Sequence, residues 1–451
     1  MDEEVRLSHS IAVSNESSSE LGQSVSSVGD ISNCLNRWKE ITDNETVLDW
    51  VRGYKIEFSD NPVQIKAPRV IKFSDIESKF VEEKVAEFID KGIVEQSSHC
   101  FGEYISNIFL RPKRDGGFRL ILNLSQLNKF VSYHHFKMEH LSDIANLVEP
   151  NFYFASIDLK DAYYSVRISP EHQKYLKFEW NDQLFQFTRM PNGLSSAPRV
   201  FTKVVKCLFA NLRGLGYLSL VYLDDSLLAG DSFANCEENV KVTIKSLESL
   251  GFVINNKKSE FIPTTKITFL GFIIDSVSMT VQLTQDKKEK IISFGKEILE
   301  IKEVKIQTLA SFIGILVSCF PGVLYGPLFY RSLERDKIKG LSRNGGNFEG
   351  FTSLCKSSFS EISWWVNNVT TSSKPIRCQP INNYIETDAS SHGWGANHEN
   401  ITTGGRWRPS EAKLHINCLE LLAVELALHA YFTNSSRIHI RVKTDSSTAV
   451  S

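Results

Sequence analysis

The chain has 451 residues, of which 42% are hydrophobic and 23% charged, so it can bury several cores of ordinary domain size. Eight cysteines occur without any Cys-x-x-Cys pair, which argues against a zinc knuckle and a disulfide framework and favours an intracellular compartment, cytoplasmic or nuclear. The formal net charge is −2, so any binding of phosphate must rest on local basic clusters.

The first 44 residues have a composition of their own. Serines gather between residues 8 and 33, and the first 50 residues contain ten acids against three bases. Such a composition is typical of segments that do not fold alone, so we expect a disordered Ser-rich leader over residues 1–44. No basic start followed by an apolar core is present, so no secretory signal is indicated.

A basic turn separates two apolar runs between Arg111 and Leu124. It carries Lys113, Arg114 and, after two glycines, Arg119, and this pattern predicts a β-hairpin with basic side chains at its tip. Taken alone, a solvated basic turn is the simpler interpretation.

Three acids occur at the ends of apolar strand patterns. Asp158 ends a run that begins at Phe154, and Asp224 and Asp225 form the turn of a predicted β-hairpin that begins at Leu218. If these strands lie side by side, Asp158 and Asp224 make an all-oxygen pocket suited to Mg²⁺. Such a pocket can hold two ions and catalyse phosphoryl transfer. The alternative is an ordinary solvated turn, which Asp also favours.

Two further features lie between these strands. Tyr163 and Tyr164 follow the first acid, and aromatic side chains in strands often serve packing alone. The run Met190–Pro198 then leads into an apolar helix, with its final proline in the first turn. Ser195 or Ser196 can cap that helix.

The remainder of the first 374 residues contains short strand and helix patterns. Leu250–Phe261 and Phe269–Asp275 are apolar runs around turns, and Leu283–Asp286 predicts the start of a helix. Ala310–Tyr330 is uncharged and long enough to suggest a membrane span. Prolines and glycines interrupt it, so two short packed helices explain it better.

A second set of acids lies near the C-terminus. Asp388 ends a strand pattern that begins at Tyr384, Glu420 lies within an apolar helix pattern, and Asp445 ends another strand pattern. A glutamate near a helix start can also serve only the helix dipole, so this set alone does not decide a function.

The order and spacing of these elements resemble the reverse transcriptases of retrotransposon polyproteins. The resemblance is to the long-terminal-repeat type or, from Trp50–Phe58 and Leu309–Gly314, to the DIRS-type tyrosine-recombinase class. It implies an α+β multidomain fold, a right-hand polymerase with fingers and palm over residues 45–275 and a thumb and connection over residues 276–374. It also implies an RNA-directed DNA polymerase that adds deoxynucleotides to a primer.

The resemblance assigns roles to the residues of the first acidic site. Asp158, Asp224 and Asp225 are the catalytic acids, and Asp158 and Asp224 would bind two Mg²⁺ or Mn²⁺ ions. Lys113 and Arg119 would hold the triphosphate of the incoming nucleotide by charge-assisted hydrogen bonds.

The resemblance assigns substrate selection to residues that neighbour these acids. Tyr163 is similar to the steric gate that fills the space of a ribose 2′-OH and so implies deoxynucleotide substrates. Asn192 departs from the family, which usually carries Gln or Phe beside the templating base pair, and leaves fidelity open. Lys257 or Lys258 is a candidate acid for the departing pyrophosphate, although a surface lysine pair is the simpler interpretation.

Asp388, Glu420 and Asp445 resemble the first three metal ligands of ribonuclease H, which cuts the RNA of an RNA–DNA hybrid. The resemblance implies a partial ribonuclease H-like α/β domain over residues 380–451. We expect it to be truncated and its activity to be weak or absent, because the family's last helices and fourth acid do not follow Asp445.

The resemblance also implies the binding partners. They are an RNA template, a DNA primer, an RNA–DNA hybrid and deoxynucleoside triphosphates, with other element-encoded proteins beside them and no membrane. Two alternatives stay open. One is an inactive remnant that only binds nucleic acid, and the other is an RNA-dependent RNA polymerase, against which Tyr163 and the ribonuclease H-like segment argue.

Overall fold

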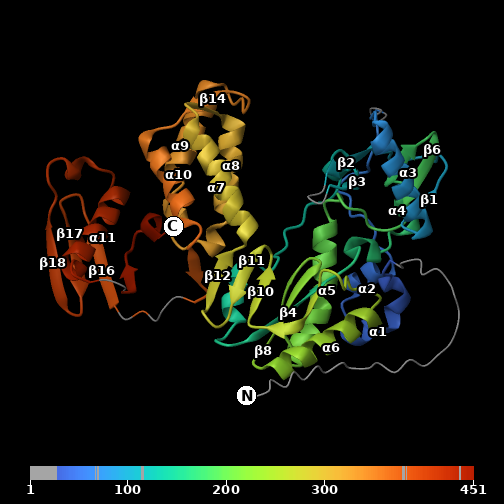
Figure 1. Cartoon of the computed structure of the whole chain (residues 1–451), viewed down its shortest axis with the longest axis horizontal. Coiled ribbons are helices and arrows are strands. Elements are labelled where there is room, and N and C mark those ends of the chain that lie inside the picture. Colours follow the sequence, from blue (N-terminus) through green and yellow to red (C-terminus); the bar gives the residue numbers. More distant parts are fainter. Residues whose placement is uncertain are drawn as a thin grey trace, which may run out of the picture. The chain divides into compact units, whose positions relative to one another are not determined.

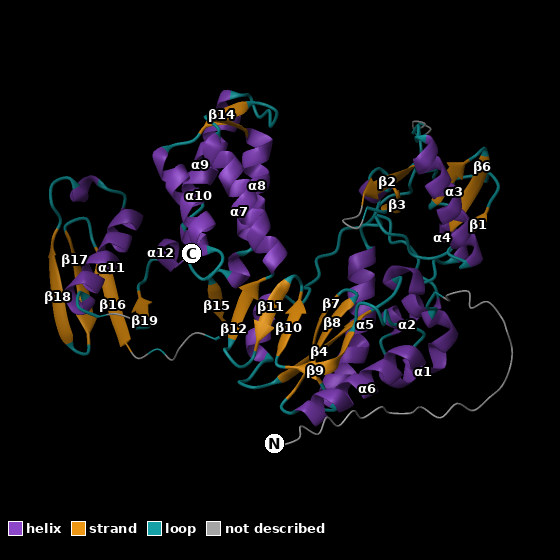
Figure 2. Ribbon diagram, in the orientation of Figure 1, coloured by secondary structure: helices purple, strands orange, loops and turns teal. Residues whose placement is uncertain are grey.

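The computed structural model describes residues 28–450 except residues 67, 69–70, 113–115, 378–380, 382 and 436–437. The chain divides into two compact units, of which the first ends at Lys374 and the second begins at Pro375. Each unit combines helices with sheets, as the element labels show (Figures 1 and 2). The predicted α+β fold class is confirmed.

The N-terminal part of the first unit is helical where the sequence predicted a disordered leader. Its segments are η1 (Ile31–Cys34), α1 (Leu35–Ile41) and α2 (Glu45–Arg52). Trp38 is fully buried, donates a hydrogen bond from its indole nitrogen to the Leu250 carbonyl at 3.2 Å and packs edge-on against Phe252. The predicted leader is therefore wrong for residues 31–41, because burial of large apolar side chains outweighs the Ser-rich composition. Residues 1–27 of that prediction lie outside the described residues.

The next segment holds one long helix and two small antiparallel sheets. Helix α3 (Asp75–Asp90) begins at a capping box in which Ser74 and Glu77 bond each other's backbone amides. A three-stranded sheet has the order β1 (Val94–Gln96), β6 (Gln183–Phe187) and β5 (Lys177–Trp180). The predicted basic hairpin is present as β2 (Ile108–Pro112) and β3 (Phe118–Leu122), with Arg111 opposite Arg119. Lys113 and Arg114 lie outside the described residues.

A four-stranded antiparallel sheet, here called the central sheet, carries the first set of acids. Its order is β7 (Leu218–Tyr222), β8 (Asp225–Gly230), β4 (Tyr153–Asp158) and β9 (Glu260–Thr264). The helices α5 (Ala197–Gly214) and α6 (Phe233–Ser249) pack against it (Figure 1). The expected pairing is present, since β4 and β8 are neighbours and Asp158 lies directly opposite Asp225.

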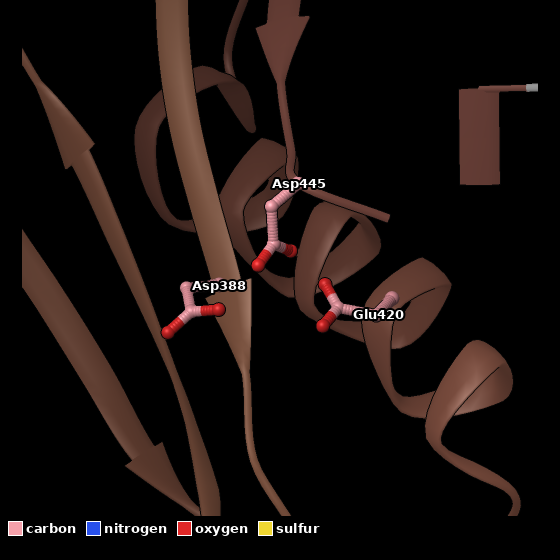
Figure 3. A group of neighbouring side chains, drawn as sticks. All are labelled: Asp388, Glu420 and Asp445. Carbon is pink, nitrogen blue, oxygen red and sulfur yellow. The ribbon is translucent and has the colours of Figure 1, made fainter. Parts of the chain in front are cut away.

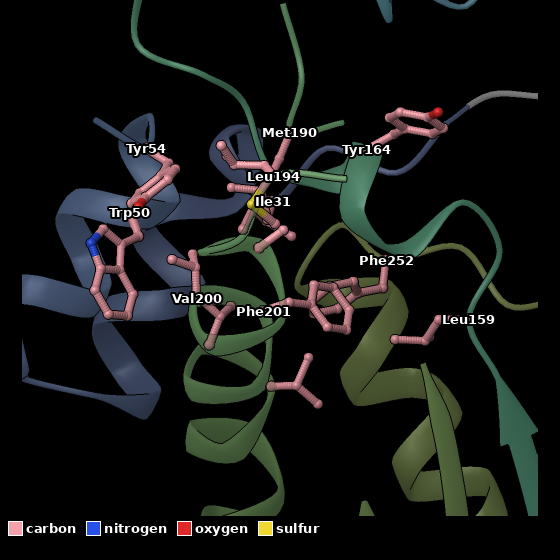
Figure 4. Packing of buried hydrophobic residues seen from close by; sticks show 14 of the residues in the cluster. Ile31, Trp50, Tyr54, Leu159, Tyr164, Met190, Leu194, Val200, Phe201 and Phe252 are labelled. Carbon is pink, nitrogen blue, oxygen red and sulfur yellow. The ribbon is translucent and has the colours of Figure 1, made fainter. Parts of the chain in front are cut away.

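The main core surrounds helix α5. Figure 4 shows Val200 and Phe201 on this helix, with Trp50 on one side and Phe252 on the other. The rings of Phe201 and Phe252 meet edge-on with their centroids 6.0 Å apart. Because α5 is packed so closely, the loop that precedes it has a fixed position beside the central sheet.

The remainder of the first unit joins small sheets to a helical bundle. One sheet has the order β10 (Lys266–Phe269), β11 (Phe272–Asp275), β12 (Thr280–Leu283) and β15 (Ser373–Pro375), and β13 (Glu303–Lys305) pairs with β14 (Phe351–Ser353). The bundle consists of α7 (Gln285–Glu300), α8 (Ile306–Ser318), α9 (Arg331–Arg343) and α10 (Lys356–Asn368) (Figure 2). A Cβ on Gly295 would lie 2.7 Å from Val366, so this glycine permits close packing of α7 on α10.

The uncharged stretch 310–330 does not form two short α-helices. Its first part belongs to α8, and only two short 3-10 turns follow, η5 (Phe320–Gly322) and η6 (Gly326–Leu328). Each turn contains a proline, whose missing N–H and fixed φ prevent a longer helix. Among the described residues, no helix combines the length and the apolar character that crossing a membrane requires.

The second unit is one sheet with one long helix. Its strands have the order β18 (Ile401–Arg406), β17 (Gly393–His398), β16 (Asn383–Ala389) and β19 (Ile440–Lys443). β16 and β19 run parallel, whereas the other pairs are antiparallel. Helix α11 (Ile416–Phe432) packs on this sheet and buries Leu419, Ala423 and Ala427, and the short helix α12 (Ser447–Val450) follows β19.

Candidate active sites

The backbone of the central sheet brings the first three acids together. Tyr222 pairs with Asp225 across the β7–β8 hairpin, so only Leu223 and Asp224 form its turn. Leu223 has a φ of +56°, a left-handed conformation that costs a residue with a Cβ roughly 1–2 kcal/mol. The Leu159 amide donates to the Asp224 carbonyl at 3.0 Å, which fixes the turn beside the end of β4.

A cavity of about 440 Å³ opens over these acids. Its walls contain five of the predicted site residues: Arg119, Asp158, Tyr163, Asn192 and Asp224. Asp225 does not line it and lies opposite Asp158 in the register of β4 and β8. Segments that are far apart in the sequence therefore line the same cavity.

Electrostatics in this cavity favour a positive ligand beside the acids. Burial, with repulsion from Asp224 and Asp158, raises the pKa of Asp225 to about 6. Burial and the charge of Asp158 also raise the pKa of Asp224, and Lys258 and Arg119 oppose that rise. Clustered carboxylates that resist ionisation are stabilised by any cation that neutralises them.

The two neighbouring tyrosines serve different purposes. Both belong to the 3-10 helix η4 (Ala162–Ser165) rather than to a strand. Both line the cavity, but Tyr164 is buried and packs edge-on against Phe88, whereas Tyr163 is only partly buried and packs edge-on against Phe201. Burial, followed by the charge of Asp224, raises the pKa of the Tyr163 hydroxyl to about 12, so it stays protonated.

The loop before α5 is held by a residue from the segment after β3. Asn128 donates from Nδ2 to the Gly193 carbonyl at 2.9 Å and accepts from the Ser195 amide at 2.9 Å. Gly193 has a φ of +105°, and a Cβ there would lie 3.0 Å from the Leu122 carbonyl, so glycine is required. Ser196 occupies the N-cap position of α5 without a capping bond from its side chain, so the predicted serine cap is wrong.

Asn192, in the same loop, donates from Nδ2 to the Tyr164 hydroxyl at 3.4 Å. Of the two candidate lysines, Lys258 lines the cavity and Lys257 does not. The Lys258 ammonium lies 3.9 Å from Asp158 Oδ2. Asn255 also lines the cavity, although its sequence context gave no signal for a site.

The second set of acids meets within the second unit. Figure 3 shows the carboxylates of Asp388, Glu420 and Asp445 pointing toward one another, and one oxygen from each lies within 4.8 Å of the others. Glu420 is buried and the two aspartates are exposed. Burial, with repulsion from Asp445 and Asp388, raises the pKa of Glu420. An all-oxygen triad of this kind suits a hard divalent cation.

Comparison with known families identifies one segment of the first unit. Residues 111–274 match the family model described as reverse transcriptase (RNA-dependent DNA polymerase). This part of the chain is a reverse transcriptase domain. It contains Arg119, Tyr163, Asn192 and the three acids of the central sheet, so the predicted relation to retroelement reverse transcriptases is confirmed. The DIRS-type subclass stays a prediction.

The similar curated proteins are viral polyproteins. The chain is 22% identical over 413 residues to the enzymatic polyprotein of Figwort mosaic virus, covering 85% of this chain and 57% of that protein. It is 25% identical over 202 residues to the Gag-Pol polyprotein of gibbon ape leukemia virus, covering 42% of this chain and 12% of that protein. The chain thus spans little more than half of the first relative's length and a much smaller share of the second's.

Solved structures agree on the fold. A foamy viral protease-reverse transcriptase in complex with RNA/DNA hybrid matches with a TM-score of 0.60 and 18% identity, over 91% of this chain and 57% of that chain. The dRH form of the foamy viral protease-reverse transcriptase in complex with double-stranded DNA matches with a TM-score of 0.62 and 18% identity. This match covers 95% of this chain and 77% of that chain. At this identity the likeness establishes a reverse transcriptase fold.

Proposed function

We propose that the chain is an RNA-directed DNA polymerase of a retroelement, which extends a DNA primer on an RNA template from deoxynucleoside triphosphates. The observation that carries this proposal is the single cavity that collects Arg119, Asp158, Tyr163, Asn192 and Asp224. A nucleotide needs carboxylates for its cations, basic groups for its phosphates and a wall for its sugar, and this cavity offers all three.

The acids fit a divalent cation. Asp158 and Asp224 offer only oxygen ligands, which suit Mg²⁺ or Mn²⁺, and a cation would relieve the repulsion that raises the pKa of Asp225. Two such ions, when bound, would supply charge stabilisation for phosphoryl transfer.

The other side chains bind and select the nucleotide. Arg119 from β3 and Lys258 from the loop after α6 present two cationic groups to a triphosphate, and Lys113 joins them in the proposal. In this proposal Lys258 would also give a proton to the departing pyrophosphate. Tyr163, in the wall of the cavity, would fill the space that a 2′-OH needs and so exclude ribonucleotides by contact.

The second unit is proposed to be a ribonuclease H-like site. Asp388, Glu420 and Asp445 would hold Mg²⁺ and direct hydrolysis of the RNA strand in an RNA–DNA hybrid. The similar foamy viral protease-reverse transcriptase structures are complexes with RNA/DNA hybrid in one case and with double-stranded DNA in the other. We propose the same classes of duplex as partners here.

The test is extension of a DNA primer on an RNA template with Mg²⁺ and deoxynucleotides. The chain is compared with Asp224→Asn and with the matched control Asp231→Asn, which makes the same change at an exposed residue just beyond β8. Incorporation by the chain and the control, with loss in Asp224→Asn, is the expected result.

Two outcomes would overturn the proposal. Duplex binding without incorporation by any of the proteins favours the inactive remnant that only binds nucleic acid. Preferred use of ribonucleotides favours an RNA polymerase.

A further inference from the structure

The loop of residues 253–259, between α6 and β9, is attached to the end of β4 where Asp158 lies. The Lys160 amide donates to the Val253 carbonyl at 2.8 Å, and Leu159 and Ile254 form an antiparallel bridge. The loop is therefore an extension of the central sheet at the position of the first acid, although it belongs to no regular strand.

Asn255 binds Asp158 at two points. Its backbone amide donates to the Asp158 carbonyl at 2.8 Å, and its side-chain Nδ2 donates to Asp158 Oδ1 at 2.8 Å. Ser259 closes the arrangement, because its hydroxyl accepts from the Asp158 amide at 3.0 Å and donates to the Asn255 carbonyl at 2.9 Å. Both the backbone and the carboxylate of Asp158 are held by the same loop.

These bonds give the two carboxylate oxygens of Asp158 different surroundings. Oδ1 accepts from the Asn255 amide, whereas Oδ2 lies 3.9 Å from the Lys258 ammonium on the same loop. The carboxylate terminates a strand beside two other acids, whose repulsion would otherwise turn it away. A neutral donor such as Asn opposes that rotation without adding a charge to compete with a cation.

We propose that Asn255 is a positioning residue that orients the Asp158 carboxylate for a divalent cation. The inference rests on the proposed function, because it concerns the same cavity. Partners of this kind, which contact a ligand residue rather than the ion, typically change cation affinity by about 10- to 100-fold when they are lost.

The first measurement uses Mn²⁺ alone, titrated into the full chain and followed by the electron paramagnetic resonance of free Mn²⁺. All proteins carry Asp388→Asn and Glu420→Gln, so that the acids of the second unit contribute little. Asn255→Ala should weaken Mn²⁺ binding by about tenfold or more. The matched control is Asn256→Ala, which changes the exposed neighbouring residue outside the cavity. It should bind Mn²⁺ as tightly as the protein that carries only the two background changes. Ser259→Ala tests the same arrangement without altering the side-chain bond to Oδ1 and should cause a smaller loss.

The second measurement is primer extension without those background changes. Asn255→Ala should require about tenfold more Mg²⁺ for half-maximal extension, with kcat restored at high Mg²⁺ and the KM for deoxynucleotide unchanged. A residue that only stabilises the fold would lower the thermal midpoint without this rescue.

The outcomes separate the two proposals. If Asp224→Asn loses Mn²⁺ and Asn255→Ala does not, the positioning role is overturned and the proposed function stands. If the background protein has no Mn²⁺ site that Asp224→Asn removes, the cation site of the proposed function fails and this inference fails with it.

Discussion

The two acidic clusters of this chain place similar groups on different scaffolds. In the first unit, Asp158 and Asp225 are direct neighbours across antiparallel strands, and Lys258 and Arg119 act on the pKa of Asp224. Sheet register sets the spacing of these acids, and two basic side chains lie close enough to act on one of them.

In the second unit the acids come from elements of different kinds. Asp388 lies on β16, Asp445 follows the parallel strand β19, and Glu420 lies on α11. The charged groups that raise the pKa of Glu420 are the two aspartates, after burial. The spacing of these carboxylates depends on how α11 packs on the sheet. A change in helix packing should therefore alter the spacing in this cluster more than in the first.

The largest contrast is expected between Asp224→Asn and Glu420→Gln in primer extension. Loss of several kcal/mol of charge stabilisation should slow extension by about 10³-fold for Asp224→Asn. Glu420→Gln changes an acid in the other unit, so single-turnover extension should be unchanged. Equal losses in both variants would show that the two clusters do not act independently.

Sugar selection should depend on the first site alone. Tyr163→Val removes the ring that faces the cavity, so the use of ribonucleotides relative to deoxynucleotides should rise by about 10- to 100-fold. Competition between the two nucleotide types in extension assays measures the ratio. Tyr164→Phe is the control, since it keeps the ring of the second cavity tyrosine and should leave the ratio as it was. An unchanged ratio in Tyr163→Val would remove the steric gate from the proposal.

The acids of the first site should destabilise the folded chain when no cation is present. The pKa of Asp225 is raised from 3.8 to about 6, so the folded state binds this proton more tightly than the unfolded state. Stability therefore falls as pH rises from about 3.8 to about 6 and stays lower above that range. The shift corresponds to ~3 kcal/mol before solvent screening, and we expect about 1–2 kcal/mol at this partly buried carboxyl.

Asp225→Asn should accordingly raise the free energy of unfolding at pH 7.5 and have little effect at pH 4. Thermal unfolding in EDTA at the two pH values measures the difference. An equal gain at both values would mean that ionisation of Asp225 is not the cause. Glu420→Gln provides the corresponding measurement in the second unit, where the pKa is also raised.

The acids themselves were predictable because their local pattern is strong. Asp158 ends an apolar strand and Asp224 lies in the turn after another, and a carboxylate at such a position has few reasons to be there except a turn or a ligand. The structure brings them together as expected. The helical start of the chain was not predictable in the same way, because the burial of Trp38 depends on Leu250 and Phe252, more than 200 residues away.

Asn255 shows the same limit within the site. Asparagine is common in polar turns, so its presence there predicts no role in the site. Only its hydrogen bond to Asp158, which is 97 positions earlier in the sequence, indicates that role. The difference in burial between Tyr163 and Tyr164 is also tertiary, since Phe88 from a distant helix packs on Tyr164 and Phe201 packs on Tyr163. Patterns within a strand identify candidate acids, whereas their supporting residues come from packing.

The smallest effect is expected at the surface of the second unit. Lys443 and Glu386 are register partners on β19 and β16, and their charged groups lie 3.0 Å apart. Both side chains are more than half exposed, at 60% and 54%, so water and salt screen the pair. Lys443→Gln should therefore change the hydrogen-exchange stability of β16 and β19 by less than ~0.5 kcal/mol. A loss above ~1 kcal/mol would mean that this ion pair helps to set the strand register, and the spacing of Asp388 and Asp445 would then depend on charge as well as on the packing of α11.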